Sequence, residues 1–259
     1  MRKILLVLFL LCLSSSALAY DWTQDENCVG AWLYAEGSGT TVADSSPNTN
    51  TGNFKGDGEP AWVGSVTGTN APAYASDCTN HDGTDDWVSY GTGMDNLTPF
   101  SYTVWLNPDA ASSGDYIYSV SATEGGGGSA GMWIGFPSTY DLTLRIFDTA
   151  SANYINAGSV DSVTTGAWKH VAVTWDGTTN SNSVFMYVNG VDLEVSASTS
   201  GGTRRSDATY YKYISGSYDG KLTENAIFSA VLDSTDINDI MDNGLLQAAT
   251  ARRRMMIIQ

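Results

Sequence analysis

The sequence has little positive charge and few of the residues on which catalytic motifs depend. Lys and Arg number 12 against 28 Asp and Glu, and His occurs twice in 259 residues. Five basic residues lie at the two ends, so the span 20–250 holds 7 basic and all 28 acidic residues. A surface this acidic repels phosphate backbones and anionic lipid headgroups. Nucleic acid and anionic membranes are therefore disfavoured as partners.

Catalytic motifs are absent or lie in the wrong context. The chain contains no CxxC or HExxH pattern. A GxSxG match at 127–131 falls in a run of glycines before a strand-like segment, whereas a nucleophile elbow opens a helix, so a flexible hairpin loop is predicted there. His170 lies within a strand-like run, which favours a hydrogen-bonded structural imidazole. No strand carries the acidic ladder that a glycoside hydrolase needs.

Only the N-terminus has an export pattern. Arg2 and Lys3 precede the apolar run 4–13, and Ala17-Leu18-Ala19 follows it. This order predicts a secretory signal over residues 1–19 and a secreted, extracellular product. A membrane anchor would need about 20 apolar residues, and no later stretch is long and apolar enough to span a membrane.

Cysteine is scarce. Cys12 would leave with the signal, so Cys28 and Cys78 remain as one pair in an oxidising compartment. A bridge closing this loop would be worth about 4 kcal/mol in the loop-entropy model. We predict a disulfide between them, with two free buried thiols as the alternative.

Short strand-like segments make up most of the rest. Apolar or alternating runs are separated by clusters of Gly, Asn, Asp, Ser and Pro, with no helical period between them, which predicts an all-β domain over residues 20–250. Asn189-Gly190 predicts a hairpin turn. Asp233 predicts the cap of one C-terminal helix that ends at Gly244. The basic and apolar tail, 251–259, differs abruptly in composition and fits a sorting tag, a docking peptide or an untidy terminus.

Aromatic residues supply the candidate ligand site. The chain has 8 Trp, 14 Tyr and 7 Phe. A sugar ring stacks its C–H face on such rings, while Asn, Asp and backbone groups bind its hydroxyls. Core packing is the alternative at each position. The candidate ligand-binding residues are Tyr118, Trp133, Tyr140, Tyr154 and Tyr211.

Two loops offer oxygen ligands for calcium. The segment ADSSPNTNTG contains Asp44 and Asn48, and DGTDD is a second candidate. Calcium prefers several oxygens on a bent loop. Asx turns explain the same residues without a metal, and both readings stay open.

The order of six motifs resembles the laminin-G-like jelly-roll domain of the concanavalin A-like lectin/glucanase superfamily. They are AWLYAEGSGTTVADSSPNTNTG, DGTDDWVSYG, PFSYTVWLNP, WKHVAVTWDG, VFMYVNGV and GKLTENAIFSAVLDSTDINDIMDNG. The resemblance implies a two-sheet antiparallel jelly-roll sandwich with one concave sheet, adjacent chain ends and one short C-terminal helix. It also implies a mostly non-catalytic role in glycan binding, adhesion or protein contact, often assisted by calcium.

Two departures from the family pattern limit these implications. Where many relatives have an acidic calcium ligand opening the last long strand, this chain has Thr223, followed by Glu224. Strand alternation predicts that Glu224 points to the other face. Asp44 is then the best calcium candidate, with Asn48 and Glu224 as further ligands. The acidic ladder of the glucanase relatives is missing.

Three functions follow as hypotheses. The first is a secreted, non-enzymatic module that binds a glycan or a cell-surface protein. The second is a structural, surface or virion component that uses the same fold for subunit contacts. The third is a polysaccharide hydrolase or lyase, which would require an opposed acidic pair in a cleft.

Overall fold

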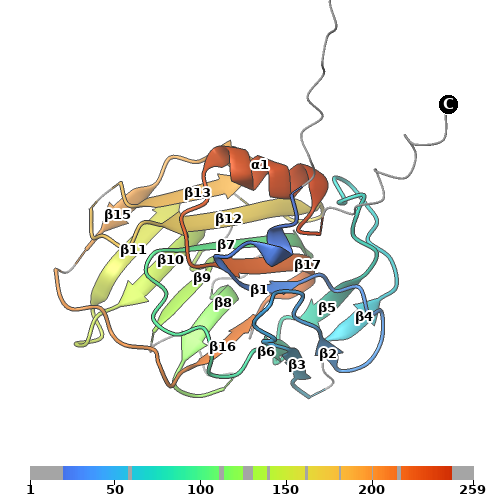
Figure 1. Ribbon diagram of the computed structural model, residues 1–259, viewed down its shortest axis with the longest axis horizontal. Coiled ribbons are helices and arrows are strands. Elements are labelled where there is room, and N and C mark those ends of the chain that lie inside the picture. The colour runs from blue at the N-terminus through green and yellow to red at the C-terminus, as the bar shows by residue number, and fades with distance from the viewer. Residues whose placement is uncertain are drawn as a thin grey trace, which may run out of the picture.

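Two antiparallel sheets stack face to face in the computed structural model, which describes residues 20–57, 60–110, 114–124, 131–138, 141–160, 163–180, 182–199, 201–214 and 217–246 (Figure 1). The predicted two-sheet antiparallel β fold with one short helix is confirmed. No helix among these residues is long and apolar enough to cross a membrane.

Sheet A has eight strands in the order β14-β13-β12-β7-β17-β5-β4, with β1 also paired to β17. Their bounds are β14 (Val191–Asp192), β13 (Val184–Val188), β12 (Lys169–Trp175), β7 (Phe100–Pro108), β17 (Asp219–Phe228), β5 (Cys78–Asp82), β4 (Ala61–Val63) and β1 (Cys28–Trp32). The predicted Asn189-Gly190 turn joins β13 to β14, and both residues have positive φ angles, 51° and 74°.

Sheet B has nine strands in the order β15-β11-β10-β9-β8-β16-β6-β3-β2. Their bounds are β15 (Ser196–Ser198), β11 (Asn153–Ser159), β10 (Leu142–Phe147), β9 (Met132–Phe136), β8 (Asp115–Ser121), β16 (Tyr211–Ile214), β6 (Trp87–Ser89), β3 (Gly52–Lys55) and β2 (Thr41–Val42). The GxSxG match lies between β8 and β9, which are paired strands. Residues 127–130 of that match lie outside the described residues.

The core lies between the sheets because each strand alternates its side chains. On β7, Phe100, Tyr102, Val104 and Leu106 face inward, with Ser101, Thr103 and Trp105 on the other face. Large aromatic residues fill this space, including Trp32, Tyr34, Tyr118 and Trp175, each at most 1% exposed.

Helix α1 (Ser234–Asn243) covers the outer face of sheet A (Figure 1). The predicted cap is confirmed, since the Asp233 side chain accepts hydrogen bonds from the amides of Thr235 and Asp236. The Asp236 carboxylate in turn accepts a hydrogen bond from the Asp233 amide. Ile237 and Ile240 pack with Ala172 and Ala226 of the sheet. Small residues at these positions allow the helix to approach the strands closely.

The two ends of the described chain lie side by side. The 3-10 turn η1 (Trp22–Gln24) packs near the end of α1, and the amide of Trp22 donates to the carbonyl of Leu245 at 3.0 Å. The adjacent chain ends implied by the family resemblance are confirmed.

The disulfide prediction is wrong. Cys28 and Cys78 are both free and buried. Cys28 opposes Phe228 on β17, whereas Thr79, next to Cys78, opposes Leu222. At about 3.3 Å per strand residue this spacing separates the cysteines by roughly 15 to 20 Å, far beyond the reach of a disulfide. Each thiol instead packs in an apolar cluster outside sheet A.

Candidate functional site

The outer face of sheet B carries a hollow of about 380 Å³. Its side chains come from three neighbouring strands, because Arg145 of β10 opposes Trp133 of β9 on one side and Asn156 of β11 on the other. Their strand neighbours Ile134 and Leu144 lie in the core, so these three residues face outward. We call this depression the sheet B hollow; it is lined by Trp133, Pro137, Asp141, Thr143, Arg145, Asn156, Gly158, Ser159, Val160 and Ser196.

Trp133 forms an aromatic wall of the hollow. It is 6% exposed, and its ring lies 5.3 Å from that of Tyr116, at an interplanar angle of 59°. Among the described residues its indole N–H has no hydrogen-bond partner. The hollow therefore offers an apolar surface together with an unused donor.

Arg145 places one positive charge in the sheet B hollow. Its Nε donates to the Asn153 side chain, and its guanidinium lies 4.7 Å from the centre of the Phe147 ring. These two contacts hold the side chain in place. The guanidinium can still donate to hydroxyl or carboxylate oxygens in a fixed geometry.

Short polar side chains complete the rim. Asn156 is half-buried, and within the described chain no hydrogen bond of its side-chain amide is seen. Ser159 also lines the hollow, but it opposes the core residue Leu142, so its buried hydroxyl points toward the core and is not part of the rim. Thr143 and Ser196 add two further hydroxyls. Such convergent donors and acceptors beside an aromatic ring can bind a polyhydroxylated ligand.

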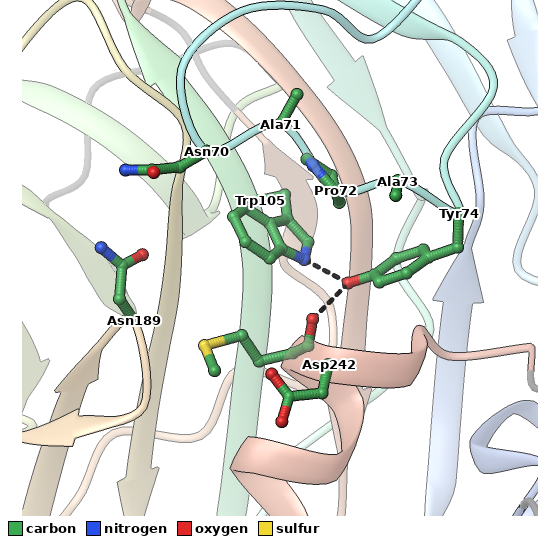
Figure 2. A pocket seen from close by; sticks show the side chains of 9 residues that line it. Asn70, Ala71, Pro72, Ala73, Tyr74, Trp105, Asn189 and Asp242 are labelled. Carbon is green, nitrogen blue, oxygen red and sulfur yellow. Dashed lines mark hydrogen bonds between the residues drawn. The ribbon is translucent and has the colours of Figure 1, made fainter.

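A second hollow, of about 370 Å³, lies outside sheet A beside the end of α1. Figure 2 shows Trp105 at its centre, with Asn70 and Asn189 on one side and Tyr74 on the other. Its polar groups bind one another. Trp105 Nε1 donates to Tyr74 Oη at 2.6 Å, and Tyr74 Oη donates to the carbonyl of Met241 at 2.9 Å. These bonds fix the end of α1 against the sheet.

The five predicted ligand-binding aromatics do not form one site. Trp133 lies in the sheet B hollow. Tyr118 is 1% exposed and lies in the core, where no surface ligand can stack on it. Tyr154 packs edge-on against Trp175 with ring centroids 6.3 Å apart. Tyr211 is half-buried on β16 opposite Ser121, and Tyr140 lies outside the described residues.

A β-bulge explains the position of Tyr118. Residues two apart on a regular strand share a face, yet Tyr116 contacts Trp133 on the outer face while Tyr118 points inward. The register of β8 against β9 shifts between Tyr116 and Tyr118. The extra residue reverses the alternation.

Asp44 and Asn48, two of the predicted calcium ligands, are already hydrogen-bonded to groups of the protein. The Asp44 carboxylate accepts the amides of Ala31, Ser46 and Asn50 at 2.7 to 2.9 Å, so it organises its own loop. Asn48 Nδ2 donates to the carbonyl of Cys28 at 2.8 Å. These bonds hold the loop against the edge of β1 that is opposite to β17. Glu224 lies on β17.

Glu224 lies on the outer side of sheet A, contrary to the prediction from alternation. The register of β17 against β7 shifts between Thr223 and Asn225, which makes Glu224 the extra residue of a bulge. Its carboxylate accepts the amide of Leu245 at 3.2 Å, just beyond α1. Burial raises the pKa of Glu224 to about 7.

The acidic turn DGTDD holds three carboxylates close together. Oxygens of Asp82, Asp85 and Asp86 lie within 4.8 Å of one another, and no other group of this kind occurs among the described residues. Backbone amides already bond each of them, for example that of Asp82 to Asp86 at 3.1 Å. Asx-type turns therefore account for the geometry without a cation.

Both histidines are buried and lie outside the sheet B hollow. Burial lowers the pKa of His81 to about 4 and that of His170 to about 3. The expectation of a fully hydrogen-bonded His170 is wrong, since its Nδ1 has no partner within the described chain. The ring packs instead against Trp105, with centroids 5.4 Å apart.

Residues 82–238 match the family model described as the concanavalin A-like lectin/glucanases superfamily. The chain belongs to this superfamily. None of the curated proteins matches the sequence of this superfamily member at a significant level.

Solved structures share the fold of this superfamily member at low sequence identity. Domain 4 of AbnA, a GH43 extracellular arabinanase from Geobacillus stearothermophilus in complex with arabinotriose, has a TM-score of 0.61 and 15% identity, covering 83% of this chain and 98% of that domain. The binding domain of Paraclostridial Mosquitocidal Protein 1 has a TM-score of 0.60 and 11% identity. The botulinum neurotoxin serotype G binding domain has a TM-score of 0.58 and 12% identity. For each toxin domain the match covers 83% of this chain and about half of the toxin domain, 52% and 50%.

Sequence reasoning missed Arg145 and Asn156. The segment DLTLRIF carries a signal for the first, because Arg145 is flanked by apolar residues and must point away from the core. The cross-strand pairing that joins it to Trp133 and Asn156 depends on strand order, which the sequence does not specify.

Proposed function

We propose that this protein is a secreted, non-enzymatic carbohydrate-binding module that holds its ligand in the sheet B hollow. The observation that carries the proposal is the cross-strand row of Trp133, Arg145 and Asn156, which lines a hollow on a sheet face that no helix of the described residues covers. A sugar ring would lie against Trp133 with its hydroxyls bound by Arg145, Asn156 and the rim hydroxyls.

The small number of carboxylates in the sheet B hollow favours ligand binding over hydrolysis. Of the lining residues in the described chain, Asp141 alone is acidic. A glycosidase uses two carboxyl groups on either side of the scissile bond. The fold relative in complex with arabinotriose supports a neutral oligosaccharide as the ligand class, and the acidic surface of this chain favours neutral over strongly anionic glycans.

A glycan array followed by calorimetry tests the proposal, with arabinotriose included in the panel. Asn156→Ala removes one rim amide without removing a hydrogen bond of the fold, and we expect the dissociation constant of the best ligand to rise about tenfold. Asn53→Ala is the matched control, since Asn53 is exposed on β3, at the far end of the same sheet. Absence of glycan binding, or equal loss in both variants, would overturn the proposal.

A second candidate function, subunit contact, rests on the edge hairpin of sheet A. Phe185 and Val191 on β13 and β14 are 40% and 62% exposed, and β14 is the last strand of its sheet. Exposed apolar residues on a sheet edge favour pairing with another chain. Concentration-dependent assembly by light scattering, abolished by Val191→Lys and unaffected by Asn156→Ala, would support this function.

A further inference from the structure

A third depression, the acidic groove, lies between η1 and the start of α1. It has a volume of about 530 Å³. Tyr20, Trp22 and Val231 supply apolar surface, and Asp25, Asp236 and Asp239 supply carboxylates. None of these residues lines the sheet B hollow, and Trp22 also packs in the apolar cluster between sheet A and α1.

The carboxylates of the acidic groove repel one another. Burial raises the pKa of Asp236, and the nearby charges of Asp233, Asp25 and Asp239 raise it further. Within the described part of the chain, no ion pair includes Asp25 or Asp236. Asp239 accepts the indole N–H of Trp22 at 2.8 Å, which fixes one carboxylate against the aromatic wall. Three of the described residues that line the groove are Asp and none is Lys or Arg, so its lining side chains make it negative.

The apolar wall of the acidic groove is open to solvent. Tyr20 is 46% exposed and Val231 is 40% exposed, although both are large apolar side chains. The Tyr20 ring lies edge-on to Trp22 with centroids 4.7 Å apart. A ligand that suits this groove combines positive charge with apolar side chains.

The chain itself carries such a segment, and it departs from beside the groove. Trp22, which lines the groove, donates its amide to Leu245, and the described chain ends at the half-exposed Leu246. Six residues later come three arginines, 252–254, followed by Met-Met-Ile-Ile at 255–258. Six residues extend up to roughly 20 Å, which is enough to bring the arginines back to the groove.

We propose that the tail, residues 251–259, docks in the acidic groove of its own molecule. The three arginines face Asp25, Asp236 and Asp239, and the Met and Ile side chains cover Tyr20 and Val231. Each exposed ion pair adds little by itself, but burial of the apolar side chains adds to it. The short connection gives the tail a local concentration in the millimolar range. Docking would neutralise carboxylates of the groove and cover its exposed apolar side chains.

Spin-label NMR on the protein carrying residues up to Gln259 tests this proposal. A nitroxide attached through Met256→Cys, in a Cys12→Ser background, should reduce the peak intensities of the Trp22 indole N–H and the Thr235 amide at least twofold. The Trp133 indole N–H, on the other sheet, should not change. Cys28 and Cys78 are buried and stay unlabelled.

Tail variants distinguish docking from chance proximity. Replacing all three arginines by Glu should abolish the broadening, whereas replacing them by Lys should preserve it, because the charge is kept. No broadening in the groove, or broadening that survives the Glu replacements, would overturn the proposal. Broadening seen only when labelled and unlabelled molecules are mixed would overturn docking within one molecule and assign the groove to a second copy.

Discussion

The outer faces of the two sheets carry the same kind of residue in opposite settings. Trp105 of sheet A and Trp133 of sheet B both lie within strands on an outer face, and they are 7% and 6% exposed. Trp105 lies beside α1 and donates its indole N–H to Tyr74. Trp133 lies in a hollow on a face that no helix of the described residues covers, and its indole N–H has no partner in the same part of the chain. The two residues therefore differ in the use of the indole N–H and not in their burial.

Small residues explain why the helix covers sheet A. Ala172 and Ala226 lie under Ile237 and Ile240, and short side chains leave room for a helix. The corresponding face of sheet B has Trp133 and Arg145, whose bulk and charge would prevent close packing of a helix. The side chains of each outer face thus account for why α1 packs on sheet A and not on sheet B.

The largest expected effect is on stability, from a substitution on the outer face of sheet A, which α1 covers. Trp105→Ala should reduce the free energy of unfolding by about 3 to 5 kcal/mol, because it leaves a cavity between sheet A and the end of α1. Urea unfolding followed by circular dichroism measures this. Trp105→Phe retains most of the packing and should cost less. If the alanine variant lost less than about 1 kcal/mol of unfolding free energy, Trp105 would not be a packing residue, which would contradict the proposed difference between the two faces.

Glu224 predicts a pH dependence that also belongs to the covered side. Its pKa is about 7 in the folded protein and 4.5 in the reference state. The folded state then binds more protons between these values, so this group makes the protein less stable as pH rises from about 4.5 to 7. Relative to Glu224→Gln, the wild type should lose up to about 3 kcal/mol over that range.

Comparison with the Gln variant is necessary because the histidines act in the opposite direction. His81 and His170 have lowered pKa values, so their contribution to stability falls as pH drops below about 6.5. Denaturant unfolding of both proteins at pH 4.5, 6 and 8 isolates the effect of Glu224. A difference between the two proteins that does not change with pH would contradict the buried, protonated carboxyl.

On the outer face of sheet B, a substitution is expected to change the affinity for the ligand. Trp133→Ala should weaken binding of the best array ligand at least tenfold, because the sugar loses its stacking surface. Trp105→Ala should leave the affinity per folded molecule unchanged. Calorimetry, with the folded fraction of each variant measured by circular dichroism, provides the comparison. Equal losses of affinity in both variants would show that the two faces are not functionally distinct.

The smallest expected effect is that of a reductant. Both cysteines pack as free thiols in the apolar layer outside sheet A, so dithiothreitol should leave the melting temperature unchanged. Thiol titration of the unfolded protein should count Cys28 and Cys78 as reactive without prior reduction. A melting temperature that falls on reduction would indicate a bridge and contradict the separation of these residues along β17.

Local patterns in the sequence predict the elements of the fold well. Alternating runs give the strands, Asn189-Gly190 gives its turn, and Asp233 gives the helix cap, because each depends on neighbouring residues only. The site is less predictable. Bulges in β8 and β17 reverse the direction of Tyr118 and Glu224, and no local signal marks them. The pairing of Trp133 with Arg145 and Asn156 depends on strand order, which arises from packing of the whole chain.

Indole N–H signals give the most direct test of the central claim that the sheet B hollow holds the ligand. In a titration of the 15N-labelled protein with the best array ligand, we expect the Trp133 indole signal to shift in proportion to occupancy while the Trp105 signal stays in place. A shift of the Trp105 signal with no change at Trp133 would contradict the account.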